Sequence, residues 1–201
     1  MHSPIFTSFP LRIVILVNII LASASPRRSE LLRAVGFEFE VIPADVEENL
    51  PEGIIPSKAV ELLAKRKALA VAEHHADDIV IGSDTLVEID GQVLGKPRND
   101  NEALEMLMLL SGKTHNVHTG VYIAGKGFDC GFTETAQVTF FPISIEEAQQ
   151  YVSTGDCNDK AGAYAIQGGA MSFVQKICGD YNAIVGLPAA RLARILRGLP
   201  L

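Results

Sequence analysis

The chain of 201 residues contains no tryptophan, and its aromatic content is only 6%. A groove that stacks single-stranded nucleic acid needs more aromatic surface than this. Basic residues are also in the minority, since 17 Lys and Arg stand against 24 Asp and Glu, for a net charge of −7. Proteins that bind duplex DNA or RNA present a net basic face. The composition therefore argues against a nucleic-acid partner, although a small basic pocket for a small anion stays open.

Cysteine is scarce as well: Cys130, Cys157 and Cys178 are widely spaced and form no CxxC pair. An odd number at these spacings predicts neither a disulfide framework nor a thiolate zinc site. Free thiols favour a reducing compartment, so we expect the protein to be cytoplasmic. Apolar residues make up 48% of the chain and charged residues 20%, which excludes intrinsic disorder. A chain of this length forms one domain, or one domain of two small lobes.

The longest apolar run covers residues 11–21 (LRIVILVNIIL) and is shorter than the roughly 20 residues that span a membrane. With Arg12 near its start and small residues at 22–24, a secretory signal would show the same pattern. We favour a buried first strand, because the run is rich in Ile and Val and ends at a serine-rich turn. We expect no membrane partner. We divide the chain into an N-terminal extension with the start of this strand (1–18) and a single domain (19–201).

The remaining hydrophobic pattern alternates helices with strands. The predicted helices cover residues 26–35, 56–75, 101–111, 144–153 and 188–197. The predicted strands cover residues 37–43, 79–82, 85–89, 92–94, 117–124, 128–141 and 172–178. Asp90-Gly91 is a strong two-residue hairpin signal between two of these strands. The order predicts a mixed α/β fold with both parallel and antiparallel strand pairs.

Residues 23–28 (SASPRR) lie between the predicted first strand and the first helix. Unpaired backbone N–H groups at a helix N-terminus favour an anion. The hydroxyls of Ser23 and Ser25 can add donors, and Arg27 and Arg28 can bind phosphate or carboxylate in a bidentate manner. The segment predicts a phosphate-binding loop, although taken by itself it fits a helix cap with two solvated arginines equally well.

Acidic residues follow two of the predicted strands. Asp84 lies in the sequence GSDT after a short apolar strand, a common place for a metal ligand or general base in α/β sheets. Glu47 and Glu48 follow the strand over 37–43 and could lie beside it. Two carboxylates at one sheet edge predict a Mg²⁺ site completed by water. The alternatives are a surface aspartate that caps the next element and a solvated acidic loop.

Two lysines and a glycine-rich segment complete the candidate residues. Lys96 lies in Gly-Lys-Pro after the hairpin, and Lys67 lies in a helix, where the two basic residues before it are expected on a solvated face. Residues 159–169 (DKAGAYAIQGG) carry little side-chain bulk, so the backbone can approach a flat ligand closely. Gln167 in this segment can pair with a base edge. A tight, poorly packed loop is the alternative interpretation.

Together these segments resemble the Maf family of nucleoside triphosphate pyrophosphatases. The motifs LASASPRR, VEEN, GSDT, GKP, THNVHTGV, DKAGAYAIQG and VGLP occur in the family's order, from about Ile19 to Arg197. The resemblance implies an α/β fold of the Maf/ITPase-like type, with a mixed, elongated β-sheet flanked by helices and two lobes around a central cleft. It also implies a homodimer.

The resemblance further implies hydrolysis of a nucleoside triphosphate to the monophosphate and diphosphate with a divalent metal cation, Mg²⁺ or Mn²⁺. By motif, Asp84 is the catalytic general base, and Glu48 and Asp84 are the metal ligands. The phosphate-binding residues implied are Ser23, Ser25, Arg28, Lys67 and Lys96. The family association also suggests a house-cleaning role and a link to inhibition of septum formation.

Three positions indicate the nucleotide. Arg27, Thr85 and Gln167 resemble the residues of the dTTP/UTP type, whereas the 7-methyl-GTP type tends to carry Trp, Gln and Glu at these positions. A glutamine donates and accepts hydrogen bonds, which suits a uracil or thymine edge. We expect dTTP and UTP as substrates, or modified pyrimidine triphosphates. The alternatives are a purine or 7-methyl-GTP-like preference, and a non-catalytic cell-division regulator or nucleic-acid-binding module.

Overall fold

The computed structural model describes residues 17–199, so residues 11–16 of the predicted first strand lie outside it. Within this range a seven-stranded sheet has the order β2-β1-β3-β5-β6-β7, with β4 paired to β3. The strands are β1 (Ile19–Leu21), β2 (Glu40–Val41), β3 (Ile79–Ile89), β4 (Gln92–Leu94), β5 (Thr114–Gly125), β6 (Phe128–Phe140) and β7 (Val174–Cys178). β1 pairs in parallel with β2 and β3, and the other pairs are antiparallel. The mixed sheet predicted from the sequence is confirmed.

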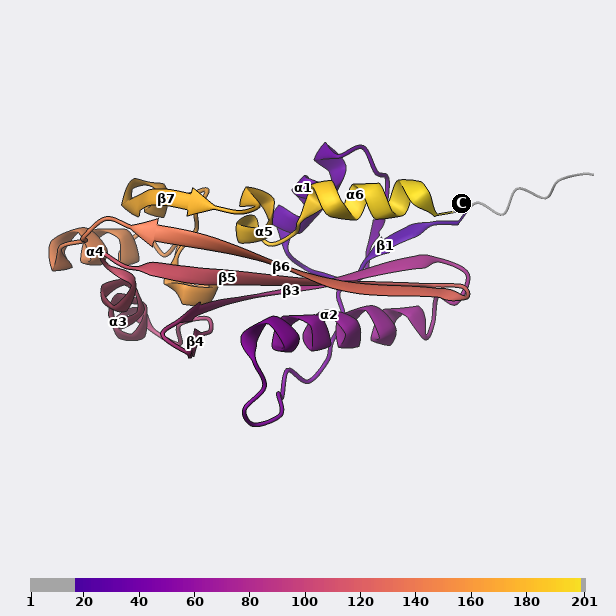
Figure 1. Ribbon diagram of the computed structural model, residues 1–201, viewed down its shortest axis with the longest axis horizontal. Coiled ribbons are helices and arrows are strands. Elements are labelled where there is room, and N and C mark those ends of the chain that lie inside the picture. The colour runs from indigo at the N-terminus through magenta and orange to yellow at the C-terminus, as the bar shows by residue number, and fades with distance from the viewer. Residues whose placement is uncertain (1–16, 200–201) are drawn as a thin grey trace, which may run out of the picture.

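Helices cover both faces of this elongated sheet (Figure 1). They are α1 (Pro26–Ala34), α2 (Pro56–Ala72), α3 (Asp100–Leu110), α4 (Ile145–Val152), α5 (Tyr181–Val185) and α6 (Ala189–Gly198), with short 3₁₀ turns η1 (Ala161–Ala163) and η2 (Gly169–Phe173). α2 lies on one face, α1, α5 and α6 lie on the other, and α3 and α4 gather at one end of the long strands (Figure 1). In the described part of the chain, no helix combines the length and apolar character needed to cross a membrane.

Gly82 does not end a strand, contrary to the sequence-based prediction of separate strands over 79–82 and 85–89. β3 runs unbroken through it. A Cβ atom at Gly82 would lie 2.1 Å from the carbonyl oxygen of Ala64 and 2.7 Å from the backbone nitrogen of Ala68, both in α2. The glycine therefore marks a place where a helix backbone meets the sheet. As a consequence Asp84 lies inside a strand and not at its end.

A second glycine brings α2 equally close to the neighbouring strand. A Cβ atom at Gly120 in β5 would lie 2.4 Å from the carbonyl carbon and oxygen of Val60. Gly82 and Gly120 thus let the backbone of α2 lie directly on β3 and β5. The long side chains at the edge of this helix consequently reach side chains of β3, which places Lys67 next to Asp84.

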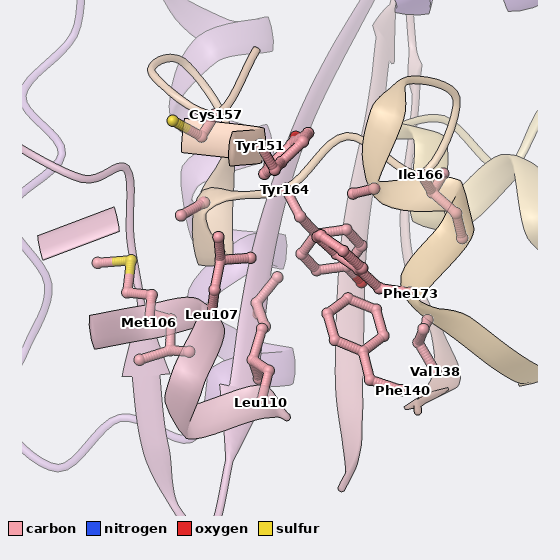
Figure 2. Close-up of a cluster of buried hydrophobic side chains, with 14 of the residues drawn as sticks. Met106, Leu107, Leu110, Val138, Phe140, Tyr151, Cys157, Tyr164, Ile166 and Phe173 are labelled. Atoms are coloured by element: carbon pink, nitrogen blue, oxygen red, sulfur yellow. The ribbon is translucent and has the colours of Figure 1, made fainter. Parts of the chain in front are cut away.

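The hydrophobic core is divided between two lobes. We call the end of the sheet that packs against α3 and α4 the distal lobe, and the end that packs against α1, α2 and α6 the proximal lobe. In the distal lobe the ring of Phe140, 1% exposed, meets Tyr164 and Phe173 edge-on at centroid distances of 4.9 and 6.1 Å (Figure 2). Burial of one such ring contributes about 1.5–3 kcal/mol. The proximal lobe packs α1 and α6 on one face of the sheet, around Leu192, and α2 on the other, around Ala68. The strands β3 and β5 carry core residues of both lobes.

Candidate active site

The sheet has a gap at the edge of β3. β1 pairs with residues 79–81 of β3 and β4 pairs with residues 87–89, so in the described chain residues 82–86 have no strand partner on this side. A cavity of about 650 Å³ opens at this place. Successive side chains of a strand point to opposite faces. Because of the gap, Asp84 and Thr85 both line the cavity although they point to different sides of the sheet.

The cavity lies between the two lobes, where the family resemblance implies a central cleft. Its lining takes Ala22 and Ala44 from the proximal lobe and Tyr164 and Ile166 from the distal lobe. All ten site residues selected from the sequence line it: Ser23, Ser25, Arg27, Arg28, Glu48, Lys67, Asp84, Thr85, Lys96 and Gln167. Segments that are far apart in the chain are thus brought to one place.

Positive charge prevails in this cavity, although the whole chain has a net charge of −7. Five cationic side chains line it: Arg27, Arg28, Lys67, Lys96 and Lys160. Three acidic side chains accompany them: Glu48, Asp84 and Asp159. A concave site of one sign attracts a ligand of the opposite sign. The cavity is therefore suited to a small polyanion.

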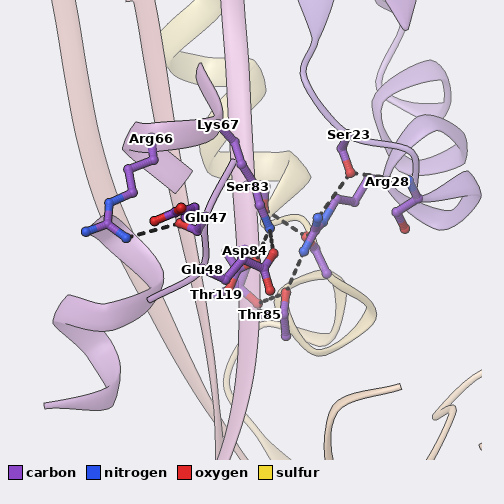
Figure 3. Close-up of polar contacts among 12 residues, drawn as sticks. Ser23, Arg28, Glu47, Glu48, Arg66, Lys67, Ser83, Asp84, Thr85 and Thr119 are labelled. Carbon is purple, nitrogen blue, oxygen red and sulfur yellow. Dashed lines mark hydrogen bonds and ion pairs between the residues drawn. The ribbon is translucent and has the colours of Figure 1, made fainter. Parts of the chain in front are cut away.

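Lys67 joins the two carboxylates that the sequence places at the metal site. Its Nζ atom donates to Oδ1 of Asp84 at 2.6 Å and lies 2.7 Å from Oε1 of Glu48 (Figure 3). The side chains of Lys67 and Asp84 are 14% and 12% exposed, whereas Glu48 is 61% exposed. The hydrogen bond from Lys67 lowers the pKa of Glu48, against the opposing effect of burial. Glu48 is therefore ionised at neutral pH, and the ion pair with Lys67 holds its solvent-exposed side chain at the cavity.

Arg28 is anchored at three corners of its guanidinium group (Figure 3). Nε donates to the carbonyl oxygen of Gly186 at 2.9 Å, Nη1 to Oγ of Ser23 at 3.1 Å, and Nη2 to Oγ1 of Thr85 at 3.2 Å. Burial lowers the pKa of Arg28, and the nearby charge of Asp84 opposes this shift. An arginine keeps its charge at neutral pH even so. Arg28 is thus a fixed positive charge at the cavity.

The turn before α1 supplies further donors. The backbone nitrogen of Ser25 donates to Oγ of Ser23 at 3.3 Å, which orders the turn. Helix α1 begins at Pro26, and the side chain of Ser25 makes no capping hydrogen bond. N–H groups in the first turn of a helix have no partner within the helix. The start of α1 therefore lies at the cavity, where its N–H groups would favour an anion.

A segment from the distal lobe completes the lining. Arg27 Nη1 lies 3.9 Å from Oδ2 of Asp159 across the cavity. The backbone N–H of Gly162 donates to the carbonyl oxygen of Gly95 at 3.0 Å and ties this segment to the loop that carries Lys96. Gly162 has a φ of +69°, and a Cβ atom there would lie 3.0 Å from Val87, so other residues are disfavoured on both counts.

Comparison with known proteins assigns the chain to a family. The profile of the family described as "Maf-like protein" matches residues 18–199. This chain belongs to the Maf family. It is 51% identical over 180 residues to proteins named dTTP/UTP pyrophosphatase from Bacillus cereus (strain G9842) and Bacillus mycoides (strain KBAB4), covering 90% of this chain and 94% of each relative. The structure of a HAM1 protein from Coxiella burnetii shares the fold, with a TM-score of 0.51 and 15% identity over 92% of this chain and 100% of that one.

Two carboxylates of this Maf-family chain fit a divalent cation. Glu48 and Asp84 both reach one point, the Nζ atom of Lys67, and carboxylate oxygens are the donors that Mg²⁺ and Mn²⁺ prefer. Among residues 17–199, no group of three or more His, Cys, Asp or Glu side chains is arranged to hold a metal ion. An ion here would thus depend on phosphate oxygens and water for its other ligands, which is common for Mg²⁺.

Sequence reasoning missed several residues of the site. Arg66, expected on a solvated face, donates through Nη1 to the carbonyl oxygens of Glu47, at 3.2 Å, and Asn49 (Figure 3). It thereby holds the loop that carries Glu48. Lys160 also lines the cavity, as does Tyr164, whose hydroxyl lies 2.8 Å from Nε2 of His115. Their positions in the motif DKAGAYAIQG were the available signal for the last two.

Proposed function

We propose that this chain is a nucleoside triphosphate pyrophosphatase that hydrolyses dTTP and UTP to the monophosphate and diphosphate. The observation that carries the proposal is the net positive cavity at the gap in the sheet, whose lining contains the Glu48–Lys67–Asp84 contact. A triphosphate needs several cations around its oxygens, and Arg28, Lys67 and Lys96 supply them. The curated relatives named dTTP/UTP pyrophosphatase support the same activity.

In the proposed mechanism Asp84 is the general base. It accepts a proton from a water molecule that attacks the α-phosphorus, and the bond from this phosphorus to the bridging oxygen breaks, so that pyrophosphate leaves. Lys67 donates a hydrogen bond to Asp84 and orients it. Arg28, Lys67 and Lys96 stabilise the negative charge that develops on the phosphate oxygens. Removal of one such contact costs about 3–4 kcal/mol of transition-state stabilisation, by analogy with oxyanion donors.

Glu48 and Asp84 would hold the metal cofactor, Mg²⁺ or Mn²⁺. When bound, the cation supplies positive charge at the phosphate oxygens and helps to ionise water. Ser23 and Ser25 bind phosphate beside Arg28 in this proposal. The single domain over 19–201, the cytoplasmic location and the homodimer stay predictions.

Arg27, Thr85 and Gln167 select the base in this proposal. All three line the cavity, and Gln167 is exposed at its rim. A glutamine amide can both donate to and accept from a uracil or thymine edge, whereas a glutamate would only accept, which suits guanine. The double variant Gln167→Glu/Thr85→Gln should therefore shift kcat/KM from UTP and dTTP towards 7-methyl-GTP. An unchanged order of substrates would show that these two residues do not determine the base selectivity.

The decisive experiment is pyrophosphate release from UTP, dTTP, CTP, GTP and 7-methyl-GTP, with and without Mg²⁺ or Mn²⁺. We expect release from UTP and dTTP that needs the cation, and loss of this activity in Asp84→Asn with the fold retained. Asp77→Asn, which alters an exposed aspartate bound to Lys126, is the matched control. Absence of release from every nucleotide would refute the function, and wild-type turnover by Asp84→Asn would remove Asp84 from the mechanism. Salt-sensitive, sub-micromolar retention of nucleic acid on a filter would favour a binding module instead.

A further inference from the structure

Thr119 lies behind the cavity and has no assigned role. It faces Thr85 across the β3–β5 pair and is 0% exposed. Thr119 Oγ1 donates to the carbonyl oxygen of Ala183 at 2.7 Å and lies 2.9 Å from Oγ1 of Thr85 (Figure 3). Its hydroxyl therefore connects a residue that lines the cavity with the backbone of α5.

The direction of these hydrogen bonds follows from counting protons. A threonine hydroxyl has one proton to donate. Thr119 donates its proton to Ala183, so it can only accept from Thr85. Thr85 has then used its own proton, and it accepts from Nη2 of Arg28 at 3.2 Å. The chain runs in one direction, from Arg28 through Thr85 and Thr119 to the carbonyl oxygen of Ala183.

This fixed direction determines what the cavity presents to a phosphate. Thr85 has no proton left for a phosphate oxygen, so it acts as an acceptor that holds Arg28. A guanidinium group has five N–H donors, and three of them are used by Gly186, Ser23 and Thr85. Two N–H donors remain. Their orientation depends on all three anchors, because a long arginine side chain is flexible without them.

We propose that Thr119 is a positioning residue for the triphosphate: through Thr85 it fixes the Arg28 guanidinium so that its two remaining N–H groups meet the phosphate oxygens. This inference rests on the proposed function. Thr119 itself contacts neither cavity nor substrate, since it lies buried behind Thr85. Loss of its hydroxyl should therefore affect the substrate only through Arg28.

The first test compares three variants of β5. Thr119→Val keeps the shape and removes the hydroxyl, whereas Thr119→Ser keeps the hydroxyl and is the conservative rescue. Thr114→Val is the matched control, because Thr114 Oγ1 forms a similar cross-strand contact with Thr139, at 2.8 Å, outside the cavity lining. We expect Thr119→Val to raise the KM for UTP and the Kd for α,β-imido-UTP about tenfold, the upper end of the effect of losing one neutral hydrogen bond. Thr119→Ser and Thr114→Val should stay within about twofold of wild type, since neither breaks the chain.

The second test is a double-mutant cycle with Arg28→Lys. A lysine has no fork to orient, so Thr119→Val should change the KM by less than about twofold in this background. A full, additive rise in both backgrounds would overturn the proposal and assign Thr119 a purely structural role. Thr85→Val breaks the same chain one link earlier and leaves the contact between Thr119 and Ala183 intact. Thr85→Val must therefore also raise the KM in the wild-type background and change it little in the Arg28→Lys background. This variant keeps the proposal testable if Thr119→Val does not fold.

These outcomes separate the inference from the function on which it rests. If wild-type protein releases no pyrophosphate from any nucleotide, the proposed function fails. If wild-type protein is active and Thr119→Val binds α,β-imido-UTP as wild type does, the function stands and the positioning role of Thr119 is refuted.

Discussion

The Nζ atom of Lys67 lies 2.6 Å from Oδ1 of Asp84, so the ammonium group takes a position that a divalent cation would also favour. The second carboxylate, that of Glu48, lies 2.7 Å from the same nitrogen. Lys67 thus lies between two acidic groups that would otherwise repel each other and offsets one of their two negative charges. It also competes with any cation that approaches the pair.

Substitution Lys67→Met should therefore strengthen metal binding in the absence of nucleotide. Two unit charges about 4 Å apart repel by about 4 kcal/mol at an effective dielectric constant of 20, so a rise in Mn²⁺ affinity of about tenfold or more is expected. Pyrophosphate release should fall by about 10²–10³, since a phosphate contact is lost as well. Calorimetric titration with Mn²⁺ alone measures the first effect. Lys65→Met on the same helix, where Nζ lies over the ring of Tyr122 at 5.2 Å, is the control, and equal Mn²⁺ affinity in all three proteins would refute the competition.

Arg66→Met should loosen the loop that carries Glu48. The guanidinium group donates to the carbonyl oxygens of Glu47 and Asn49, and without it the ion pair between Glu48 and Lys67 has to hold this exposed loop on α2 alone. We expect the Mn²⁺ concentration that half-activates pyrophosphate release to rise about threefold to tenfold, for a total loss of about 1 kcal/mol from these two exposed hydrogen bonds. The melting temperature should hardly change. A drop in melting temperature with unchanged metal dependence would instead indicate a structural role.

Local sequence patterns predicted the elements that depend on neighbouring residues. The hairpin at Asp90-Gly91 and the capping box of Ser144 and Glu147 both occur as expected, because their hydrogen bonds join residues close in the chain. The motifs also selected residues that the structure brings to one cavity. α5, with only five residues, is too short to give a periodic signal, and it was missed.

Local sequence patterns could not predict contacts between distant segments. Arg66 resembles part of a solvated basic run, and its partners, 17 and 19 residues away, are backbone carbonyls that leave no trace in the sequence. Thr119 finds its partner 64 residues away, at Ala183. Gly82 was interpreted as a strand end, since the helix that approaches it is visible only in three dimensions.

Gly82→Ala should destabilise the protein and weaken its activity. The new Cβ atom would lie 2.1 Å from the carbonyl oxygen of Ala64, so α2 must move away from β3. Overpacking of this kind costs about 1–3 kcal/mol of unfolding free energy. The shift would also draw Lys67 away from Asp84. Urea denaturation measures the loss, and Gly125→Ala, whose Cβ atom would meet Ile79 at an ordinary 3.5 Å, should stay within about 0.5 kcal/mol of wild type. Equal stability of the two variants would contradict the close approach of α2.

His115 should make the stability of the protein depend on pH. Burial beside Phe140 and Tyr164 lowers the pKa of His115 from its ordinary value of 6.5 to about 4. Between these values the unfolded chain binds a proton that the folded protein excludes, so stability falls as pH drops from about 6.5 to about 4, by up to about 3 kcal/mol. Below pH 4 both states are protonated, and this contribution changes no further. His115→Gln retains a partner for the Tyr164 hydroxyl and has no titrating group. Denaturation at pH 7, 5.5 and 4.5 should therefore show a smaller loss of unfolding free energy with falling pH for this variant than for wild type. An equal loss in both proteins would show that His115 does not exclude the proton.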